Sequence, residues 1–192
     1  SIESLSLEFI YLLIHEAGKT TQDAHDEIRE AIDFLRYYAD QSHSLNAQLT
    51  QLGPTGEDNI LEYCPKGLVA CISPWNFPLA ITLGQIAAAL VTGNTVIAKP
   101  SEHTPLIASK AINLFFNHGL PRDALHLLLG GGELGHAIIE SQFIDMVVFT
   151  GSLSTAKNIH HTLAKKPGKI VPLIAETGGL NSMVVDSSAL IE

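Results

Sequence analysis

From residue 63 onward, short apolar runs alternate with longer segments of helical spacing, and this alternation limits the possible folds more than any other feature of the sequence. The runs lack a polar residue at every second position, which is typical of strands buried on both faces of a parallel sheet. The pattern predicts a doubly wound α/β domain with right-handed crossovers. The expected strands are 68–73, 95–98, 125–129, 146–149, 170–176 and 182–185. The expected helices are 79–91, 105–117, 133–140 and 154–163.

Residues 1–62 lack this alternation, and we expect them to form an N-terminal helical appendage and a connector. Residues 4–17 have helical spacing and end before a glycine that suits a helix C-cap. A capping pattern then begins a second helix, expected over 21–42. The stretch Gly53-Pro54-Thr55-Gly56 predicts a loop. We therefore divide the chain into 1–62 and a second domain, 63–192.

The composition indicates a globular protein, because 46% of the residues are hydrophobic, 16% are charged and the formal net charge is −9. A negative charge argues against a nucleic-acid partner or an anionic membrane surface. The most apolar N-terminal stretch, residues 5–14, is shorter than the roughly 20 residues of a transmembrane helix, so we expect no membrane span. Cys64 and Cys71 form no CxxC pair, which favours a reducing, cytoplasmic location. Because the chain lacks an initiating Met, we expect it to be part of a longer protein.

A stiff turn joins the first expected strand of the second domain to the helix that follows. Its sequence is Ile72-Ser73-Pro74-Trp75-Asn76-Phe77-Pro78, and the two prolines fix the backbone on either side of Trp75 and Asn76. Such a turn presents polar groups and free helix N–H groups at the carboxyl end of the sheet. Open α/β folds bind their ligands at this edge.

Three other expected strands also end in polar residues. Lys99 and Glu102 follow one strand, where a carboxylate can accept from the hydroxyls of a ribose and a lysine can donate to the same sugar. A solvated ion pair beside a helix cap explains them equally well. Gly151 and Ser152 suit either a phosphate site or a plain helix cap. Glu176 ends an apolar strand, where a carboxylate is costly unless it is used or paired, so it is a candidate general base.

The segment Gly130–Gly135 matches the spacing GxGxxG between an expected strand and a helix. In dinucleotide-binding folds this loop holds a pyrophosphate, and an acidic residue at the end of the next strand binds a ribose. The next strand ends in Val148-Phe149-Thr150, so the fingerprint is incomplete and an ordinary turn is an equal alternative. His160 and His161 are adjacent and point in different directions on a helix, so we expect no metal site there.

Four motifs follow one another in the order typical of the aldehyde dehydrogenase superfamily, and the chain resembles that superfamily. These motifs are Pro74-Trp75-Asn76-Phe77-Pro78, Lys99-Pro100-Ser101-Glu102, Phe149-Thr150-Gly151-Ser152 and Glu176-Thr177-Gly178-Gly179. Residues 34–39, 53–57 and 175–181 carry a closer similarity, to the glutamate-semialdehyde (1-pyrroline-5-carboxylate) dehydrogenase module of bifunctional proline utilization A (PutA) proteins. The resemblance implies that 63–192 is the Rossmann-like, NAD-binding domain of a longer catalytic chain.

The resemblance also implies that NAD is the cofactor, and it suggests a role for individual residues. Asn76 matches the residue whose amide helps to form the oxyanion hole, and Glu176 matches the general base that activates water. Lys99 and Glu102 match ligands of the adenosine ribose, and a carboxylate there repels a 2′-phosphate, which favours NAD over NADP. The glycine loop matches a segment that borders the adenine. The implied cofactor-binding residues are Ile72, Ser73, Pro74, Trp75, Lys99, Ser101, Glu102, Gly132, Gly135, Phe149, Thr150, Gly151, Ser152, Thr177 and Gly178.

The family's nucleophilic cysteine lies downstream of the Glu-Thr-Gly-Gly motif, and therefore beyond residue 192. Neither cysteine of the chain fits that role. Cys71 lies within an apolar strand and is expected to be a small core residue, and Cys64 precedes a proline with no base nearby in the sequence. We therefore expect the isolated chain to be inactive.

By the same resemblance, the parent enzyme oxidises a small aldehyde, L-glutamate γ-semialdehyde, to glutamate with NAD in proline catabolism. It is expected to be a homo-oligomer and to be fused to a proline dehydrogenase domain. Two alternatives stay open. One is a dehydrogenase for another semialdehyde, such as succinate semialdehyde, and the other is an NAD-binding or interaction module without chemistry.

Overall fold

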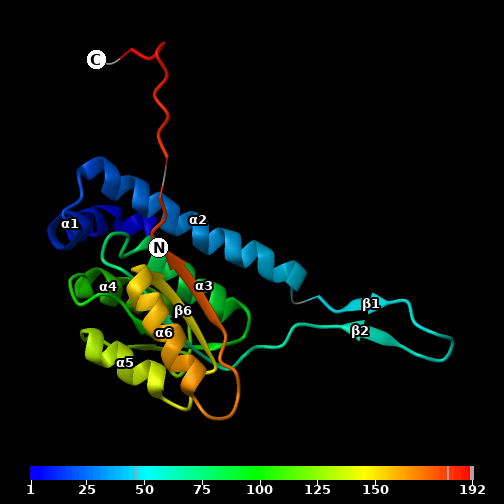
Figure 1. The fold of residues 1–192 in the computed structure, drawn as a ribbon. Helices are drawn as coiled ribbons and strands as arrows, with labels where there is room; N and C mark the ends of the chain where they lie inside the picture. The colour runs from blue at the N-terminus through cyan, green and yellow to red at the C-terminus, as the bar shows by residue number, and fades with distance from the viewer. Residues whose placement is uncertain (46, 181, 191–192) are drawn as a thin grey trace.

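The computed structural model describes residues 1–45, 47–180 and 182–190. A five-stranded parallel sheet forms its centre (Figure 1). The strands lie in the order β5-β4-β3-β6-β7, and every neighbouring pair is parallel. Their bounds are β3 (Leu68–Ile72), β4 (Thr95–Lys99), β5 (Leu125–Leu127), β6 (Met146–Gly151) and β7 (Leu173–Thr177). The predicted doubly wound α/β sheet is confirmed.

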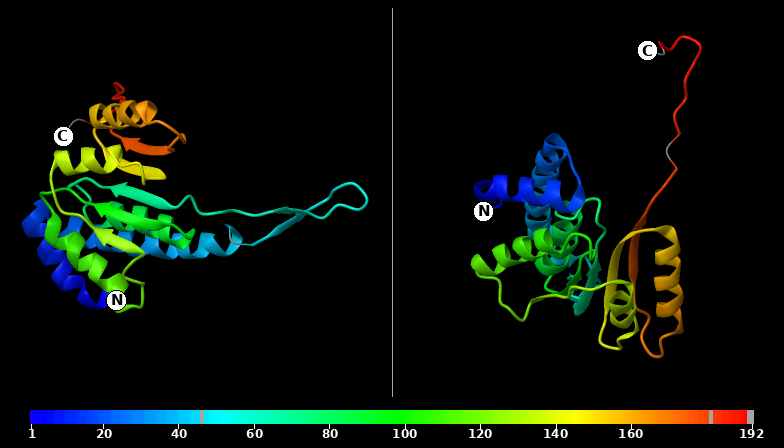
Figure 2. Two further views of the ribbon diagram at one scale, coloured as in Figure 1. Left: turned by 90° about the horizontal axis from the view of Figure 1, so that it is seen from below. Right: turned by 90° about the vertical axis from the view of Figure 1, so that its left-hand side faces the viewer.

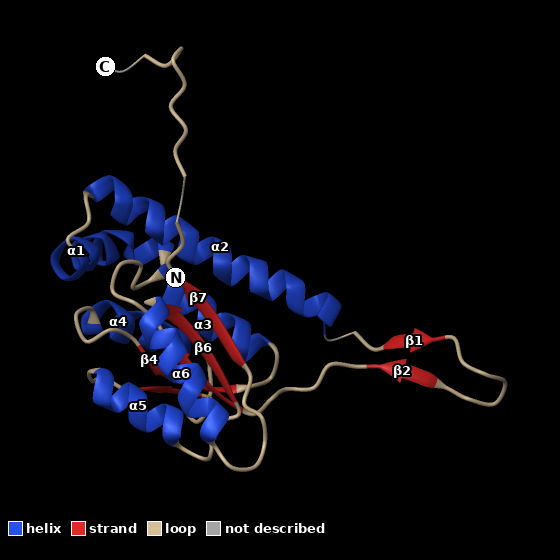
Figure 3. Cartoon of the chain, in the orientation of Figure 1, coloured by secondary structure: helices blue, strands red, loops and turns tan. Residues whose placement is uncertain are grey.

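Helices cover both faces of the sheet, and Figure 3 shows α5 and α6 together on one side of the strands. Successive residues of β3 point to opposite faces, as the pleat of a strand requires. Val69 and Cys71 pack with α3 and α4, whereas Ala70 packs with α5 and α6. This double burial explains why the strands read as unbroken apolar runs. The four helices are α3 (Ala80–Val91), α4 (Pro105–Asn117), α5 (Gly132–Glu140) and α6 (Leu153–Lys165).

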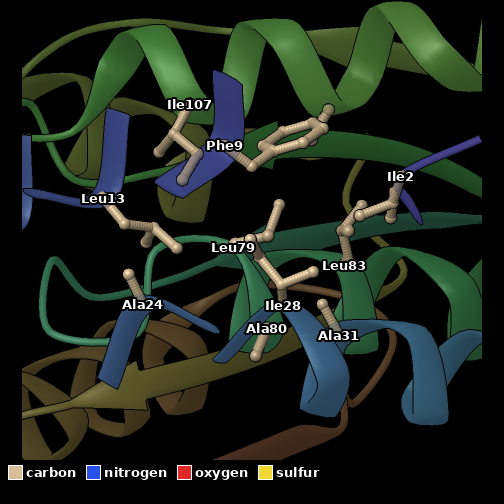
Figure 4. Close-up of a cluster of buried hydrophobic side chains, with 11 residues drawn as sticks. Ile2, Phe9, Leu13, Ala24, Ile28, Ala31, Leu79, Ala80, Leu83 and Ile107 are labelled. Carbon is tan, nitrogen blue, oxygen red and sulfur yellow. The ribbon is translucent and has the colours of Figure 1, made fainter. Parts of the chain in front are cut away.

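The N-terminal helices share a hydrophobic core with α3 and α4. Figure 4 shows Phe9, Ala24 and Ile28 beside Leu79 and Ala80, and all five side chains are buried. Because apolar contacts cross position 62 in this way, the division of the chain there stays a proposal. These elements are the 3-10 helix η1 (Glu3–Leu5), α1 (Ser6–Ala17) and α2 (Thr21–Leu45).

The expected connector contains a β-hairpin that the sequence reasoning missed. β1 (Leu49–Gln51) pairs antiparallel with β2 (Asn59–Leu61), and the hairpin extends away from the rest of the molecule (Figure 2). The predicted loop at Gly53–Gly56 lies between the two strands. Neither face of the hairpin is covered, so its sequence has no alternation of apolar and polar residues to mark the strands.

The expected strand at 182–185 is wrong, since the described residues 182–190 contain no strand. Met183 and Val184 are 88% and 91% exposed, and the segment leads away from the sheet (Figure 1). A strand requires a neighbour that bonds its backbone groups, and no described strand lies beside this one. The last residue of the 175–181 motif lies outside the described residues. None of the helices in the described ranges is long and apolar enough to cross a membrane.

Candidate active site

The carboxyl ends of the strands bring the four sequence motifs to one edge of the sheet. The chain runs from β3 outward to β5 and then returns to β6 on the other side, so β3 and β6 flank the switch point of the sheet. In the register, Ile72 pairs with both Lys99 and Phe149, and Thr150 pairs with Glu176. Ligands of open α/β sheets bind outside such a switch point.

The turn after β3 leaves its two central side chains open to solvent. Trp75 is 55% exposed and Asn76 is also exposed. Ser73 is different: its side chain is buried, and its hydroxyl lies 2.6 Å from the hydroxyl of Thr82 on α3. Its backbone N–H donates to the carbonyl of Lys99 at 3.2 Å. Ser73 therefore bonds the turn to α3 and β4, whereas the side chains of Trp75 and Asn76 are open to a ligand.

A cavity of about 310 Å³ lies between this edge and helices α5 and α6. Residues from five separate segments line it, and they include six of the fifteen residues proposed to bind the cofactor. The proposed cofactor residues in the lining are Ile72, Lys99, Glu102, Gly132, Gly135 and Phe149. Residues far apart in sequence thus share one concave site, which is where small-molecule ligands bind.

Lys99 and Glu102 form the polar part of this cavity. The Lys99 side chain is buried, its Nζ lies 3.9 Å from Glu102 Oε2, and it donates to the carbonyl of Pro100 at 3.3 Å. Burial lowers the pKa of Lys99, and the nearby Glu102 carboxylate opposes this shift. Half of Glu102 is exposed, so its carboxylate is available to a ligand.

The glycine loop packs against this pair of charged residues. A Cβ at Gly135 would lie 3.6 Å from the Lys99 side chain, and one at Gly131 would lie 3.8 Å from Glu102 Oε1. The loop therefore borders the proposed ribose ligands. This position fits the expectation from the resemblance better than the pyrophosphate position of a complete GxGxxG fingerprint.

Ser152 and Gly151 have local structural roles at the end of β6. The Ser152 hydroxyl accepts from the N–H of Thr155 at 3.1 Å, which makes Ser152 the N-cap of α6. A Cβ at Gly151 would lie only 2.6 Å from the ring of Phe149, so this ring requires a glycine. Ser152 is thus a helix cap, which is one of the two alternatives that the sequence left open. The N-terminus of α6 lies at the same edge of the sheet as the other motifs.

Glu176 lies apart from the cavity that Lys99 and Glu102 line, which we name the ribose cavity after their proposed role. It is exposed, so the cost of burying a carboxylate is no argument for its role, and that part of the sequence reasoning is wrong. It lines a second groove of about 420 Å³ together with Thr150 and Ile174. Phe149 faces the ribose cavity and Thr150 faces this groove, because successive strand residues point to opposite faces. Thr177 and Gly178 follow Glu176 and do not line the ribose cavity.

The sequence pattern of the Aldehyde dehydrogenase family matches residues 1–192. The chain belongs to the aldehyde dehydrogenase family. It is 50% identical to the bifunctional protein PutA of Rhizobium meliloti, over 93% of this chain and 14% of PutA. It is 41% identical to 1-pyrroline-5-carboxylate dehydrogenase of Anoxybacillus flavithermus, over 96% of this chain and 37% of that enzyme. The chain thus spans only a small part of the length of these relatives.

Solved structures agree with this family assignment. A crystal structure of bifunctional PutA superposes with a TM-score of 0.91 at 52% identity, over 93% of this chain and 18% of PutA. A 1-pyrroline-5-carboxylate dehydrogenase from Thermus, described with bound NAD, gives a TM-score of 0.89 at 34% identity. That match covers 93% of this chain and 36% of the Thermus protein. The resemblance stated from the four motifs is therefore confirmed at the level of the family.

Gln85, a buried residue near the candidate site of this aldehyde dehydrogenase chain, was not among the residues predicted from the sequence. Gln85 of α3 donates to the Thr150 hydroxyl at 3.0 Å and to the Ile72 carbonyl at 3.4 Å, so it ties the end of β6 to the end of β3. It is 8% exposed. The available signal was a pair of polar residues, Thr82 and Gln85, three positions apart in an otherwise apolar helix.

Proposed function

We propose that the protein containing this chain is an NAD-dependent aldehyde dehydrogenase that oxidises L-glutamate γ-semialdehyde to glutamate in proline catabolism. The observation that carries the proposal is the cavity that joins Lys99 and Glu102 to the glycine loop and Phe149 at the switch point of the sheet. The choice of substrate is supported by the relatives, which are named bifunctional protein PutA and 1-pyrroline-5-carboxylate dehydrogenase.

The described residues fit the adenosine half of NAD. Glu102 has a half-exposed carboxylate that accepts hydrogen bonds from two ribose hydroxyls, and Lys99 donates to the same sugar. The carboxylate also disfavours a 2′-phosphate by charge repulsion, so NAD is preferred over NADP. Gly132 leaves open space where a side chain would otherwise stand. NAD, when bound, accepts the hydride that the aldehyde loses.

We assign the remaining cofactor contacts to the strand ends on the same edge. Trp75 and its neighbours approach the cofactor from β3, and the N-terminus of α6 faces its phosphates. Segments after β6 and β7 complete the set. The proposed contacts besides Lys99, Glu102 and Gly132 are Ile72, Ser73, Pro74, Trp75, Ser101, Gly135, Phe149, Thr150, Gly151, Ser152, Thr177 and Gly178.

Two residues are proposed to act on the aldehyde carbon. The Asn76 amide donates to the oxygen that gains negative charge when a nucleophile attacks, and a positioned donor of this kind is worth about 3–4 kcal/mol in the transition state. Glu176 takes a proton from the water that releases the acid product. The nucleophile is proposed to be a cysteine beyond residue 192. Cys71 does not fit that role because it is buried and burial raises its pKa to about 12, which keeps it as a thiol.

We also propose that the parent protein carries a proline dehydrogenase domain and works as a homo-oligomer in the cytoplasm. The first part is supported by relatives that are named bifunctional PutA. The second is supported by the projecting β1–β2 hairpin, on which Leu49, Leu52 and Ile60 are exposed. An exposed apolar hairpin with unpaired edges is a surface that another chain can cover. The free cysteines fit a reducing compartment.

The function is tested by following NADH absorbance in two proteins. One is the 192-residue chain and the other is a protein extended to the length of the dehydrogenase relatives. The extended protein is expected to reduce NAD with glutamate semialdehyde at a higher kcat/KM than with succinate semialdehyde, and the short chain is expected to be inactive. A preference for succinate semialdehyde would overturn the substrate, and turnover by the short chain would overturn the assignment of the nucleophile.

A further inference from the structure

Glu27 is a buried carboxylate that the proposed function does not use. It lies on α2 and is 1% exposed. Its Oε1 accepts from the backbone N–H groups of Leu79 at 2.8 Å and Ala80 at 3.1 Å, and its Oε2 forms an ion pair with Lys19 Nζ at 2.8 Å. Burying a carboxylate is costly, so the groups that bind the Glu27 carboxylate indicate its structural role.

The two N–H groups that donate to Glu27 lie at the start of α3. The first N–H groups of any helix have no partner within the helix, and α3 begins at Ala80 with no side-chain cap of its own. Pro78 has no N–H, and Ile81 already donates to the carbonyl of Phe77. Leu79 and Ala80 are therefore the donors that need an acceptor, and Glu27 satisfies both while its charge complements the helix dipole.

The ion-pair partner of Glu27 contacts the same turn. Lys19 Nζ lies 3.8 Å from the centre of the Phe77 ring, within the range of a cation–π interaction. Phe77 directly follows Asn76, and Leu79 comes two residues later. One buried ion pair thus holds the segment that directly follows Asn76, the residue of the proposed oxyanion-hole amide.

A second carboxylate repeats this arrangement at the next loop of the site. Glu16, at the end of α1, accepts from the N–H groups of Leu106 and Ile107, each at 2.8 Å. These groups lie in the first turn of α4, whose N-cap residue Thr104 makes no capping bond with its side chain. Helix α4 follows directly after the loop that begins behind Lys99 and carries Glu102, and the Thr104 N–H donates to the carbonyl of Ser101 in that loop.

We propose that α1 and α2 position the two loops of the active site through these carboxylates. Glu27 positions the turn that carries Asn76, and Glu16 positions the loop that follows Lys99 and carries Glu102. Both act as positioning residues, since neither touches the proposed cofactor or substrate. The proposal rests on the proposed function for what the loops do, but the capping itself is independent of it. The N-terminal helices are then part of the active-site frame and more than an appendage.

The test uses the protein extended to the length of its relatives, with Glu27→Ala and Glu16→Ala as matched variants. Each removes one carboxylate that caps one helix. Hydrogen–deuterium exchange of peptides from the starts of α3 and α4 reads the freed amides directly. Glu27→Ala is expected to speed exchange roughly tenfold at Leu79 and Ala80 and to leave α4 unchanged, and Glu16→Ala is expected to do the reverse.

The kinetic effects are expected to separate in the same way. Glu27→Ala lowers kcat by about 10- to 100-fold with a smaller change in the KM for NAD, because a displacement near 1 Å at a reacting group has an effect of this size. Glu16→Ala raises the KM and the calorimetric Kd for NAD with a smaller change in kcat. Glu27→Gln, which keeps an acceptor oxygen, is expected to restore protection of the two amides and part of kcat. It also replaces the alanine variant if that variant does not fold.

Two results would overturn the proposal. One is faster exchange at both helices to the same degree in each variant, which is the mark of general destabilisation. The other is freed amides at Leu79 and Ala80 with an unchanged kcat. If the native protein oxidises no aldehyde while the exchange pattern appears as expected, the proposed function fails and the capping role stands.

Discussion

Gly151→Ala is expected to destabilise the protein and to weaken NAD binding at the same time. The new Cβ would lie 2.6 Å from Cζ of the Phe149 ring, closer than Cβ atoms approach in folded proteins, and 3.2 Å from its Cε2. Phe149 is 4% exposed, so its ring can move only by displacing the core side chains around it. Overpacking of this kind costs about 1–3 kcal/mol. For a chain of this length that corresponds to a fall in Tm of roughly 2–12 °C.

The assay is thermal unfolding of the 192-residue chain by circular dichroism, together with calorimetric titration of NAD. Gly132→Ala is the matched control for stability, because it lines the cavity that Phe149 also lines and a Cβ there meets nothing within 4 Å. Its Tm is expected to stay the same or rise slightly, since alanine restricts the unfolded chain. The double variant Gly151→Ala with Phe149→Leu should recover part of the lost stability through a favourable coupling. Equal Tm values for the Gly151 variant and the native chain would refute the steric reasoning.

Three further predictions concern the charged and thiol groups. Glu102→Gln is expected to raise the Kd for NAD and to reduce the preference for NAD over NADP, measured by titration with both dinucleotides. An unchanged preference would show that the Glu102 carboxylate is not the source of that preference. Burial lowers the pKa of Lys99, so the unfolded chain holds that proton more tightly and stability rises with pH through the interval between the two values. Lys99→Met is therefore expected to raise the stability at pH 7 and to flatten that rise in urea titrations, and a less stable variant would contradict it. Burial raises the pKa of Cys71 to about 12, so a thiol reagent at pH 8 should modify Cys64 alone until the chain unfolds.

The separation of Glu176 from the ribose cavity bears on how the site works. The cavity and the groove that Glu176 lines lie on opposite faces of the sheet, and Gln85 and Thr150 line the groove beside Glu176. The proposed general base therefore lies away from the proposed binding site of the adenosine half of NAD.

The amino-acid sequence by itself determined the elements of the sheet and the residues at the strand ends. Burial on both faces leaves an unbroken apolar run in each strand, and a polar residue that ends such a run must lie at the edge of the sheet. Lys99, Glu102 and Ser152 were placed at that edge for this reason. The prediction failed at 49–61 and at 182–185, because exposed segments carry no periodic signal and an apolar run forms a strand only beside a partner.

Only the tertiary structure decided which of these groups share a site and what holds them in place. The caps of α3 and α4 come from Glu27 and Glu16, which lie 52 and 90 positions away along the chain from the first N–H groups they bind. The steric need for Gly151 arises from the position of the Phe149 ring in the core, and the register of β7 with β6 places Glu176 beside Thr150, on the face opposite the cavity. Local spacing reports which face of an element is buried, but it contains no record of the distant residue that covers that face.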